Sequence, residues 1–191
     1  ISECLVGSEM CIRDSDCLPT PEGIQICRDY HIQMPMQSAF IGWKQEPDEY
    51  LERILGHDRL EKLNPIKTFR DNDIMVSFGS DAPCTTPDPI AWMDRAVNND
   101  NAGQAVSVQD ALRMCTYNGA WAAFDEQERG SLEAGKIADM AVLSENPYTV
   151  PKDKLSGLRV ERLYLSGKCY ESCRESILPM MLRGLTSRNK A

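Results

Sequence analysis

The sequence lacks the features that mark membrane proteins, secreted proteins and nucleic-acid-binding proteins. It has no apolar run near the roughly 18 residues that a membrane-spanning helix needs, and its first residues lack the basic-then-apolar pattern of a secretory signal. Its 21 basic residues are outnumbered by 29 acidic ones, so no excess of Lys and Arg is available to bind phosphates. These absences predict a cytoplasmic protein with no membrane and no nucleic-acid partner.

What the sequence does contain is typical of an ordinary globular protein. Of its 191 residues, 42% are hydrophobic, 26% are charged and 7% are aromatic. This composition excludes disordered and collagen-like chains, because it supplies enough apolar surface to form a core.

The N-terminal segment does not read as part of a natural protein. Residues 4–15 (CLVGSEMCIRDS) resemble the translation of an adapter used to prepare sequencing libraries. We therefore expect residues 1–15 to lie outside the fold. The rest begins near Asp16 inside what reads as a strand-to-helix connection, which predicts that further chain precedes it.

The cysteines outside that segment are scattered and form no CxxC pair. In a chain without a secretory signal, such spacing predicts reduced, mostly buried thiols and neither a disulfide framework nor a zinc knuckle. A disulfide stays open only for Cys169 and Cys173. The six cysteines are Cys17, Cys27, Cys84, Cys115, Cys169 and Cys173.

The first two thirds of the sequence alternate helical and strand patterns. Amphipathic spacing, prolines at helix starts and a Ser107 cap predict helices, and short apolar runs predict strands. Alternation of this kind predicts an α/β fold. The expected helices are residues 21–30, 47–55, 65–72, a stretch from 89 onward, and 107–124, and the expected strands are 32–37 and 74–78.

The composition changes at Gly130, where a different kind of unit begins. A compact apolar run at residues 138–143 is followed by a period-two alternation at 158–165, and residues 166–168 lead into a further strand as a hairpin. This part predicts a separate small sheet. The tail, residues 172–191, is predicted to be helical and then polar.

Three segments together resemble the metal-dependent amidohydrolases, specifically amidohydrolase family 3. They are residues 76–83 (VSFGSDAP), 107–120 (SVQDALRMCTYNGA) and 130–147 (GSLEAGKIADMAVLSENP), and the GxLxxGKxAD pattern is the most specific of them. The resemblance implies the C-terminal part of a (β/α)8 TIM-type barrel over residues 16–128. It further implies the C-terminal strands of a small β-sandwich over 129–171, with 172–191 as a tail.

The resemblance implies that Asp81 is both a metal ligand and the catalytic acid–base. In such barrels the active site lies at the carboxyl ends of the strands, and a carboxylate beside a metal-bound water can pass its proton to the leaving amine. Without the resemblance, Ser80 and Asp81 favour a turn or cap at the end of a strand over a catalytic role.

The loop after residues 32–37 carries Phe40, Trp43 and Lys44. In the family such loops lie over the pocket, so these side chains are predicted to contact an acyl or amide substrate. Ordinary loop packing is the alternative, and the residues themselves favour neither.

The remaining metal ligands of the family are missing from the sequence. The family site needs a His-x-His pair, a Lys or acidic bridging ligand and further histidines. Only His31 and His57 are present, and neither stands at the C-terminal end of a predicted strand. We expect the parent protein to use a divalent metal, zinc, to hydrolyse a non-peptide C–N bond of a small amide, formamide or cyclic amide. We expect this chain to bind no metal and to be inactive. The alternative is a non-catalytic scaffold or interaction fragment, and a homo-oligomer stays open.

Overall fold

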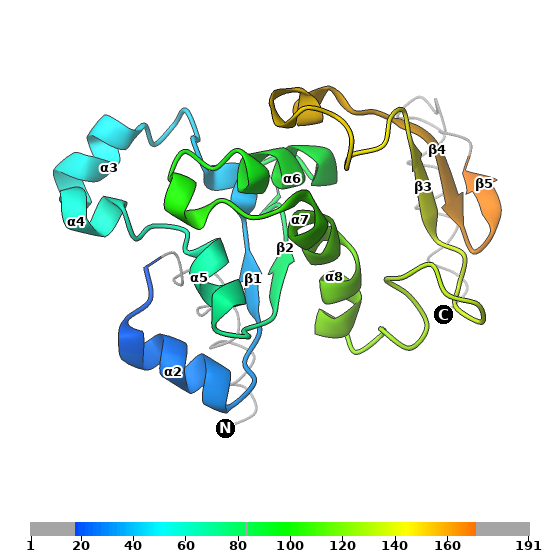
Figure 1. The fold of residues 1–191 in the computed structure, drawn as a ribbon, viewed down its shortest axis with the longest axis horizontal. Helices are drawn as coiled ribbons and strands as arrows, with labels where there is room; N and C mark the ends of the chain where they lie inside the picture. The colour runs from blue at the N-terminus through cyan, green and yellow to red at the C-terminus, as the bar shows by residue number, and fades with distance from the viewer. Residues whose placement is uncertain (1–17, 83, 171–191) are drawn as a thin grey trace, which may run out of the picture.

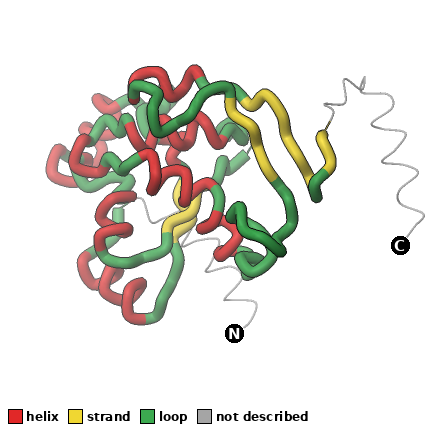
Figure 2. Tube along the Cα trace, turned by 45° about the vertical axis from the view of Figure 1, so that its right-hand side comes forward, coloured by secondary structure: helices red, strands yellow, loops and turns green. Residues whose placement is uncertain are grey.

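The computed structural model describes residues 18–82 and 84–170, which contain two separate sheets (Figure 1). One is a parallel pair inside a helical unit, and the other is a three-stranded antiparallel sheet that lies to one side of it (Figure 2). The predicted α/β class with a separate β unit is therefore confirmed. The predictions for residues 1–15 and 172–191 lie outside the described residues. The strands are β1 (Met34–Met36), β2 (Val76–Phe78), β3 (Met140–Leu143), β4 (Val160–Leu165) and β5 (Lys168–Tyr170).

Helices occupy most of the positions that the sequence patterns predicted. In the part of the chain that the structure describes, no helix is long and apolar enough to cross a bilayer. The α-helices are α2 (Pro21–Asp29), α3 (Asp48–Leu55), α4 (His57–Leu60), α5 (Ile66–Asp71), α6 (Pro89–Val97), α7 (Val108–Cys115) and α8 (Tyr117–Ala122). Three 3-10 turns accompany them: η1 (Ser38–Phe40), η2 (Ala102–Gln104) and η3 (Lys152–Gly157).

The parallel pair β1–β2 forms the centre of the core. Met34 pairs with Val76, and both side chains are almost completely buried. Both predicted strands are confirmed but are shorter than their apolar runs, and Pro35 within β1 has no N–H to donate. Hydrophobic burial by the surrounding helices holds the two strand ends in place. The side chains that pack around the pair include Ile66, Phe69, Met93, Ala96, Ala111, Met114 and Leu155.

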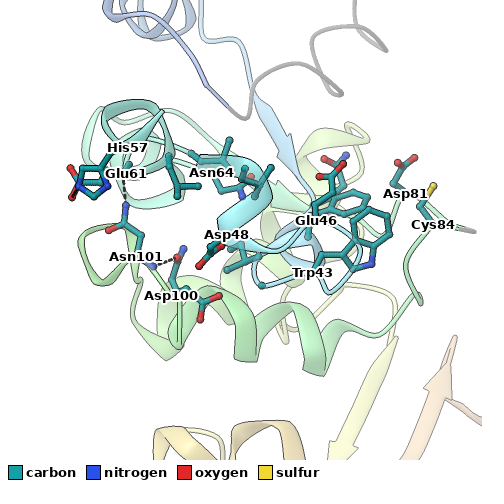
Figure 3. Close-up of a pocket in the computed structure, with 18 residues that line it drawn as sticks. Trp43, Glu46, Asp48, His57, Glu61, Asn64, Asp81, Cys84, Asp100 and Asn101 are labelled. Carbon is teal, nitrogen blue, oxygen red and sulfur yellow. Dashed lines mark hydrogen bonds and ion pairs between the residues drawn. The ribbon is translucent and has the colours of Figure 1, made fainter. Parts of the chain in front are cut away.

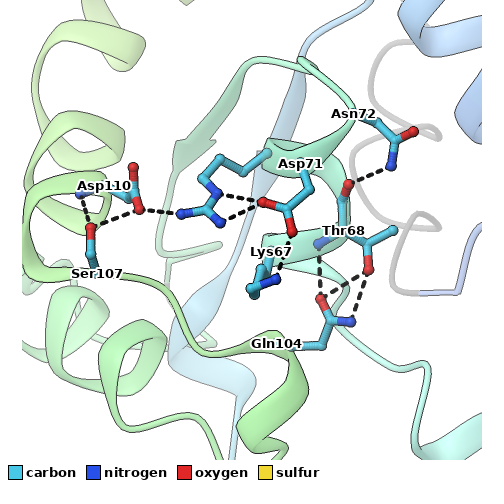
Figure 4. Close-up of polar contacts among 8 residues, drawn as sticks. Lys67, Thr68, Asp71, Asn72, Gln104, Ser107 and Asp110 are labelled. Atoms are coloured by element: carbon cyan, nitrogen blue, oxygen red, sulfur yellow. Dashed lines mark hydrogen bonds and ion pairs between the residues drawn. The ribbon is translucent and has the colours of Figure 1, made fainter.

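A polar network holds α5 against the start of α7 (Figure 4). Arg70 Nη1 lies 2.6 Å from Asp110 Oδ2, and the same guanidinium also pairs with Asp71. Ser107 caps α7, because its Oγ accepts from the Asp110 N–H at 3.0 Å and donates to the Asp110 carboxylate at 2.7 Å. Burial opposes ionisation of Asp110, but the bonds from Ser107 and Arg70 outweigh it and lower the pKa of that carboxyl. The predicted cap is therefore confirmed.

One predicted helix is wrong in its length. The pattern predicted a single helix over residues 107–124, but the structure breaks it at Thr116, whose φ is −125° and ψ is −89°. The Thr116 hydroxyl donates to the Leu112 carbonyl at 2.7 Å, which is the acceptor that its own N–H would use in a continuous helix. The new direction of α8 lets the buried Asn118 amide donate to the Val76 carbonyl at 2.6 Å.

The glycine-rich segment before β3 ties α8 to the antiparallel sheet. Gly130 has a φ of +84°, and a Cβ there would lie 2.6 Å from the Ala120 Cβ, so a larger residue would force a shift. The Lys136 Nζ donates to a backbone carbonyl at 2.7 Å, and the Asp139 carboxylate accepts from the Ser166 N–H at 2.7 Å. The most specific sequence motif therefore has a structural role in this chain.

The antiparallel sheet has the order β3-β4-β5. Ser166 and Gly167 both have positive φ, 50° and 75°, which is the backbone of a tight hairpin turn between β4 and β5. The predicted pairing of residues 138–143 with 158–165 is confirmed, with a register irregularity between Val142 and Leu143. The predicted domain boundary at residues 128–129 is not tested by these contacts and stays a prediction.

Candidate active site

The carboxyl ends of β1 and β2 meet at one edge of the parallel pair. Beyond β2, the Gly79 N–H donates to the Met36 carbonyl at 3.0 Å, so the two following loops start side by side. Gln37 stands directly after β1, and Asp81 stands shortly after β2. The predicted position of Asp81, just beyond the end of a parallel strand, is confirmed. In α/β folds this is the edge at which ligands bind.

The turn that carries Asp81 is fixed by its own hydrogen bonds. Asp81 has a φ of +52°, a left-handed conformation that Asp adopts more readily than most residues. The Cys84 N–H donates to the Asp81 carbonyl at 2.9 Å, and the Ala82 N–H donates to the Ser80 hydroxyl at 3.2 Å. The Thr85 hydroxyl closes the turn by donating to the Ser80 carbonyl. This loop therefore holds the Asp81 backbone in one orientation.

An open pocket of about 520 Å³ lies beside Asp81, a volume that suits a small molecule (Figure 3). Phe40 and Trp43 line it together with Asp81. Their rings are 4.9 Å apart between centroids, at an interplanar angle of 78°, and form an edge-to-face pair. Lys44 is exposed and is not among the lining residues. The structure thus brings three of the predicted site residues together, and their contact with a substrate stays a prediction.

The pocket wall is acidic. Among its lining residues, all within the described part of the chain, there is no Lys or Arg. Trp43, Glu46 and Asp81 lie towards one end of the pocket, and His57 and Glu61 lie towards the other (Figure 3). The lining carboxylates are those of Glu46, Asp48, Glu61, Asp81 and Asp100.

Gln37 is a pocket residue that the sequence patterns did not single out. It is only 9% exposed, yet it lines the pocket. Within residues 18–82 and 84–170 its side-chain amide bonds to no other residue, and its polar atoms stay open to the pocket. The only signal for it in the sequence is a polar residue placed directly after a short apolar strand.

The two histidines are placed as the sequence indicated, away from the carboxyl ends of β1 and β2. His31 is an exposed turn residue with a φ of +53°. His57 is exposed at the start of α4, where Nδ1 lies 3.2 Å from Glu52 and Nε2 lies 3.6 Å from Glu61. Across the described ranges, no three His, Cys, Asp or Glu side chains converge as metal ligands. These donors alone therefore do not fit the metal that the family resemblance implies.

The described thiols should differ in reactivity. Cys84, Cys115 and Cys169 are free, as predicted, but the prediction that the thiols are mostly buried is wrong, because two of these three lie on the surface. Cys17 and Cys173 lie outside the described residues. Cys84 and Cys169 are exposed, whereas burial raises the pKa of the Cys115 thiol to about 12. Because the thiolate is the nucleophile, we expect iodoacetamide to modify the two exposed thiols at least about tenfold faster than Cys115. Peptide mass spectrometry measures the rates, with the urea-unfolded chain as control, and equal rates in the folded chain would contradict this expectation.

Comparison with known proteins matches residues 22–170 to the amidohydrolase family. The chain is 34% identical over 152 residues to an N-substituted formamide deformylase from Arthrobacter pascens, covering 76% of this chain and 26% of that protein. It is 29% identical over 128 residues to a 5-methylthioadenosine/S-adenosylhomocysteine deaminase from Caldanaerobacter subterraneus, covering 58% of this chain and 29% of that one. The chain thus spans about a quarter of the length of the curated relatives that it matches.

Solved structures share the same fold. A metal-dependent hydrolase from Pyrococcus furiosus superposes with a TM-score of 0.62 at 24% identity, over 70% of this chain and 28% of that chain. An adenosine deaminase from Xanthomonas campestris with bound zinc superposes with a TM-score of 0.59 at 17% identity, over 89% and 40% of the respective chains. These neighbours confirm the predicted barrel fold class, of which this chain supplies a part. Since the family match runs from α2 to the end of β5, the chain belongs to the amidohydrolase family, within the superfamily of metal-dependent amidohydrolases.

Proposed function

We propose that the whole protein hydrolyses a non-peptide C–N bond in a small amide, formamide or cyclic amide. The observation that carries this proposal is Asp81 beside a pocket at the carboxyl ends of two parallel strands. The family membership and the similarity to an N-substituted formamide deformylase support the same bond type.

In this proposal Asp81 moves one proton twice. Its carboxylate accepts a proton from the water that attacks the carbonyl carbon, and it then donates that proton to the nitrogen as the C–N bond breaks. One water is consumed, and the products are a carboxylic acid and an amine. Phe40 and Trp43 form an aromatic wall against which the substrate packs. Lys44, which follows Trp43 and is exposed, contacts the substrate from the rim of the pocket.

We further propose that the metal of the whole protein is zinc, with Asp81 as one ligand. The bound zinc in the Xanthomonas campestris adenosine deaminase supports this choice of metal. Because the described residues do not complete a ligand set, this chain by itself holds no stoichiometric zinc and is inactive in our proposal. The same observation favours a second candidate, in which the isolated chain acts as a non-catalytic scaffold or interaction fragment.

A chimera tests the proposed reaction. The segment of the Arthrobacter pascens deformylase that matches this chain is replaced by the corresponding residues of this chain, and formate release from an N-substituted formamide is measured. We expect hydrolysis by the chimera and none by the 191-residue chain alone. A chimera that folds and binds metal but releases no formate would count against the proposal. Hydrolysis by the chain alone would show that its own ligands suffice.

A further inference from the structure

The pocket beside Asp81 is lined by negatively charged side chains, and not all of them are explained by a role in stabilising the fold. Asp48 stands in the first turn of α3, where the helix dipole favours a carboxylate, so its position has a structural explanation. Glu46 has no such explanation, because it precedes the helix in a turn in which its N–H donates to the Trp43 carbonyl at 3.0 Å. That turn places Glu46 and Trp43 on the same pocket, with no Lys or Arg in the described lining to balance the charge.

Gln37 independently indicates a polar ligand. More than nine-tenths of the residue is buried, and its amide lines the pocket without a partner among the described residues. Its nitrogen and oxygen are not sealed in the core but stay open to the pocket, where a ligand can bond to them. An amide side chain can donate to a carbonyl and accept from an N–H at once, which matches the two polar atoms of a substrate amide.

We propose that this pocket selects amides that also carry a protonated amine. Gln37 holds the amide group, and Glu46 holds the ammonium group against the face of Trp43, with Asp48 adding negative potential. A cation is attracted by the lining carboxylates and by the electron-rich ring, whereas the same lining carboxylates repel a carboxylate-bearing amide. The identity of the amide rests on the proposed function, but the selection for positive charge does not.

Three formamides of similar length and different charge test the selection. They are N-(aminobutyl)formamide, N-pentylformamide and formamidopentanoate, and their dissociation constants for the complete chain are measured by calorimetry. We expect the cationic compound to bind about tenfold tighter than the neutral one and the anionic compound to bind most weakly. The preference should shrink as salt is added, because the pocket is open to solvent.

Two variants and one matched control assign the roles. Glu46→Gln should weaken binding of the cationic compound about fivefold and leave the neutral compound unchanged. Glu49→Gln is the control, because Glu49 is exposed on α3 and is not among the lining residues. Gln37→Met should weaken all three compounds alike, since each carries the same formamide group.

The outcomes separate this inference from the proposed reaction. Equal affinity for the three compounds, or binding of none of them, overturns it whatever the chimera does. An equal loss in the Glu46→Gln and Glu49→Gln variants also overturns it, because net charge alone would then explain the preference. If charge selection holds while the chimera releases no formate, the inference stands and the proposed hydrolysis fails.

Discussion

Replacing Asp81 by Asn in the chimera is expected to lower kcat for C–N hydrolysis by about 100- to 10,000-fold, the range for a lost acid–base group. Asn is close to Asp in size and adopts the same left-handed backbone, so the turn at φ +52° should survive. The amide cannot accept the proton of the attacking water, and the carbonyl carbon then meets a poorer nucleophile. Steady-state kinetics with separate kcat and KM values measure the loss.

Asp73→Asn is the matched control for this variant. Asp73 also has a positive φ, 58°, but it precedes β2 and so lies at the opposite end of the same strand. We expect its kcat to stay within about twofold of the unmodified chimera. If the two variants lost activity equally, or if Asp81→Asn kept full activity, Asp81 would have no part in the proton transfers.

Replacing Phe69 by Ala is expected to cost about 3–5 kcal/mol of unfolding free energy. Phe69 is 0% exposed and belongs to the core cluster that includes Met34 and Val76. The truncation leaves a cavity where α5 packs beside β2. A loss of this size is a large part of the roughly 5–15 kcal/mol that stabilises a typical domain. Urea denaturation of the complete chain, followed by circular dichroism, measures it.

Phe124→Ala is the control for the core substitution. Phe124 is 90% exposed and has a φ of +58°, so the same side chain is removed at a position where it buries almost nothing. We expect a change within about 0.5 kcal/mol. A loss in Phe124→Ala as large as in Phe69→Ala would mean that the assigned core does not hold this fold together.

The secondary structure could be predicted where short-range interactions decide it. Thr20 caps α2 by accepting from the Gly23 N–H, and Asp88 caps α6 by accepting from the Ile90 N–H, each within a few residues along the chain. Such signals are visible in a single sequence. The break at Thr116 was not predictable in the same way, because the residues on both sides of it continue a helical pattern.

Part of the candidate site could be predicted, and part could not. Asp81 could be predicted because it stands in a motif beside a recognisable strand. Phe40 and Trp43 could be predicted as aromatic residues in a loop after another strand. Gln37 and the acidic wall were missed, because a single Gln or Glu in a polar stretch carries no pattern of its own. They become a site only when separate segments are folded together.

The sequence by itself determined most of the helices, the strands, the family and the position of Asp81 just after a strand, because caps, periodicity and motif spacing act between neighbouring residues. Only the tertiary structure decided which side chains share the pocket. Glu46 and Asp100 are far apart in the chain, and both reach the pocket beside Asp81 because the helices bury the parallel pair and fix its carboxyl ends. Packing of this kind is set by contacts between distant segments, which no local pattern in the sequence records.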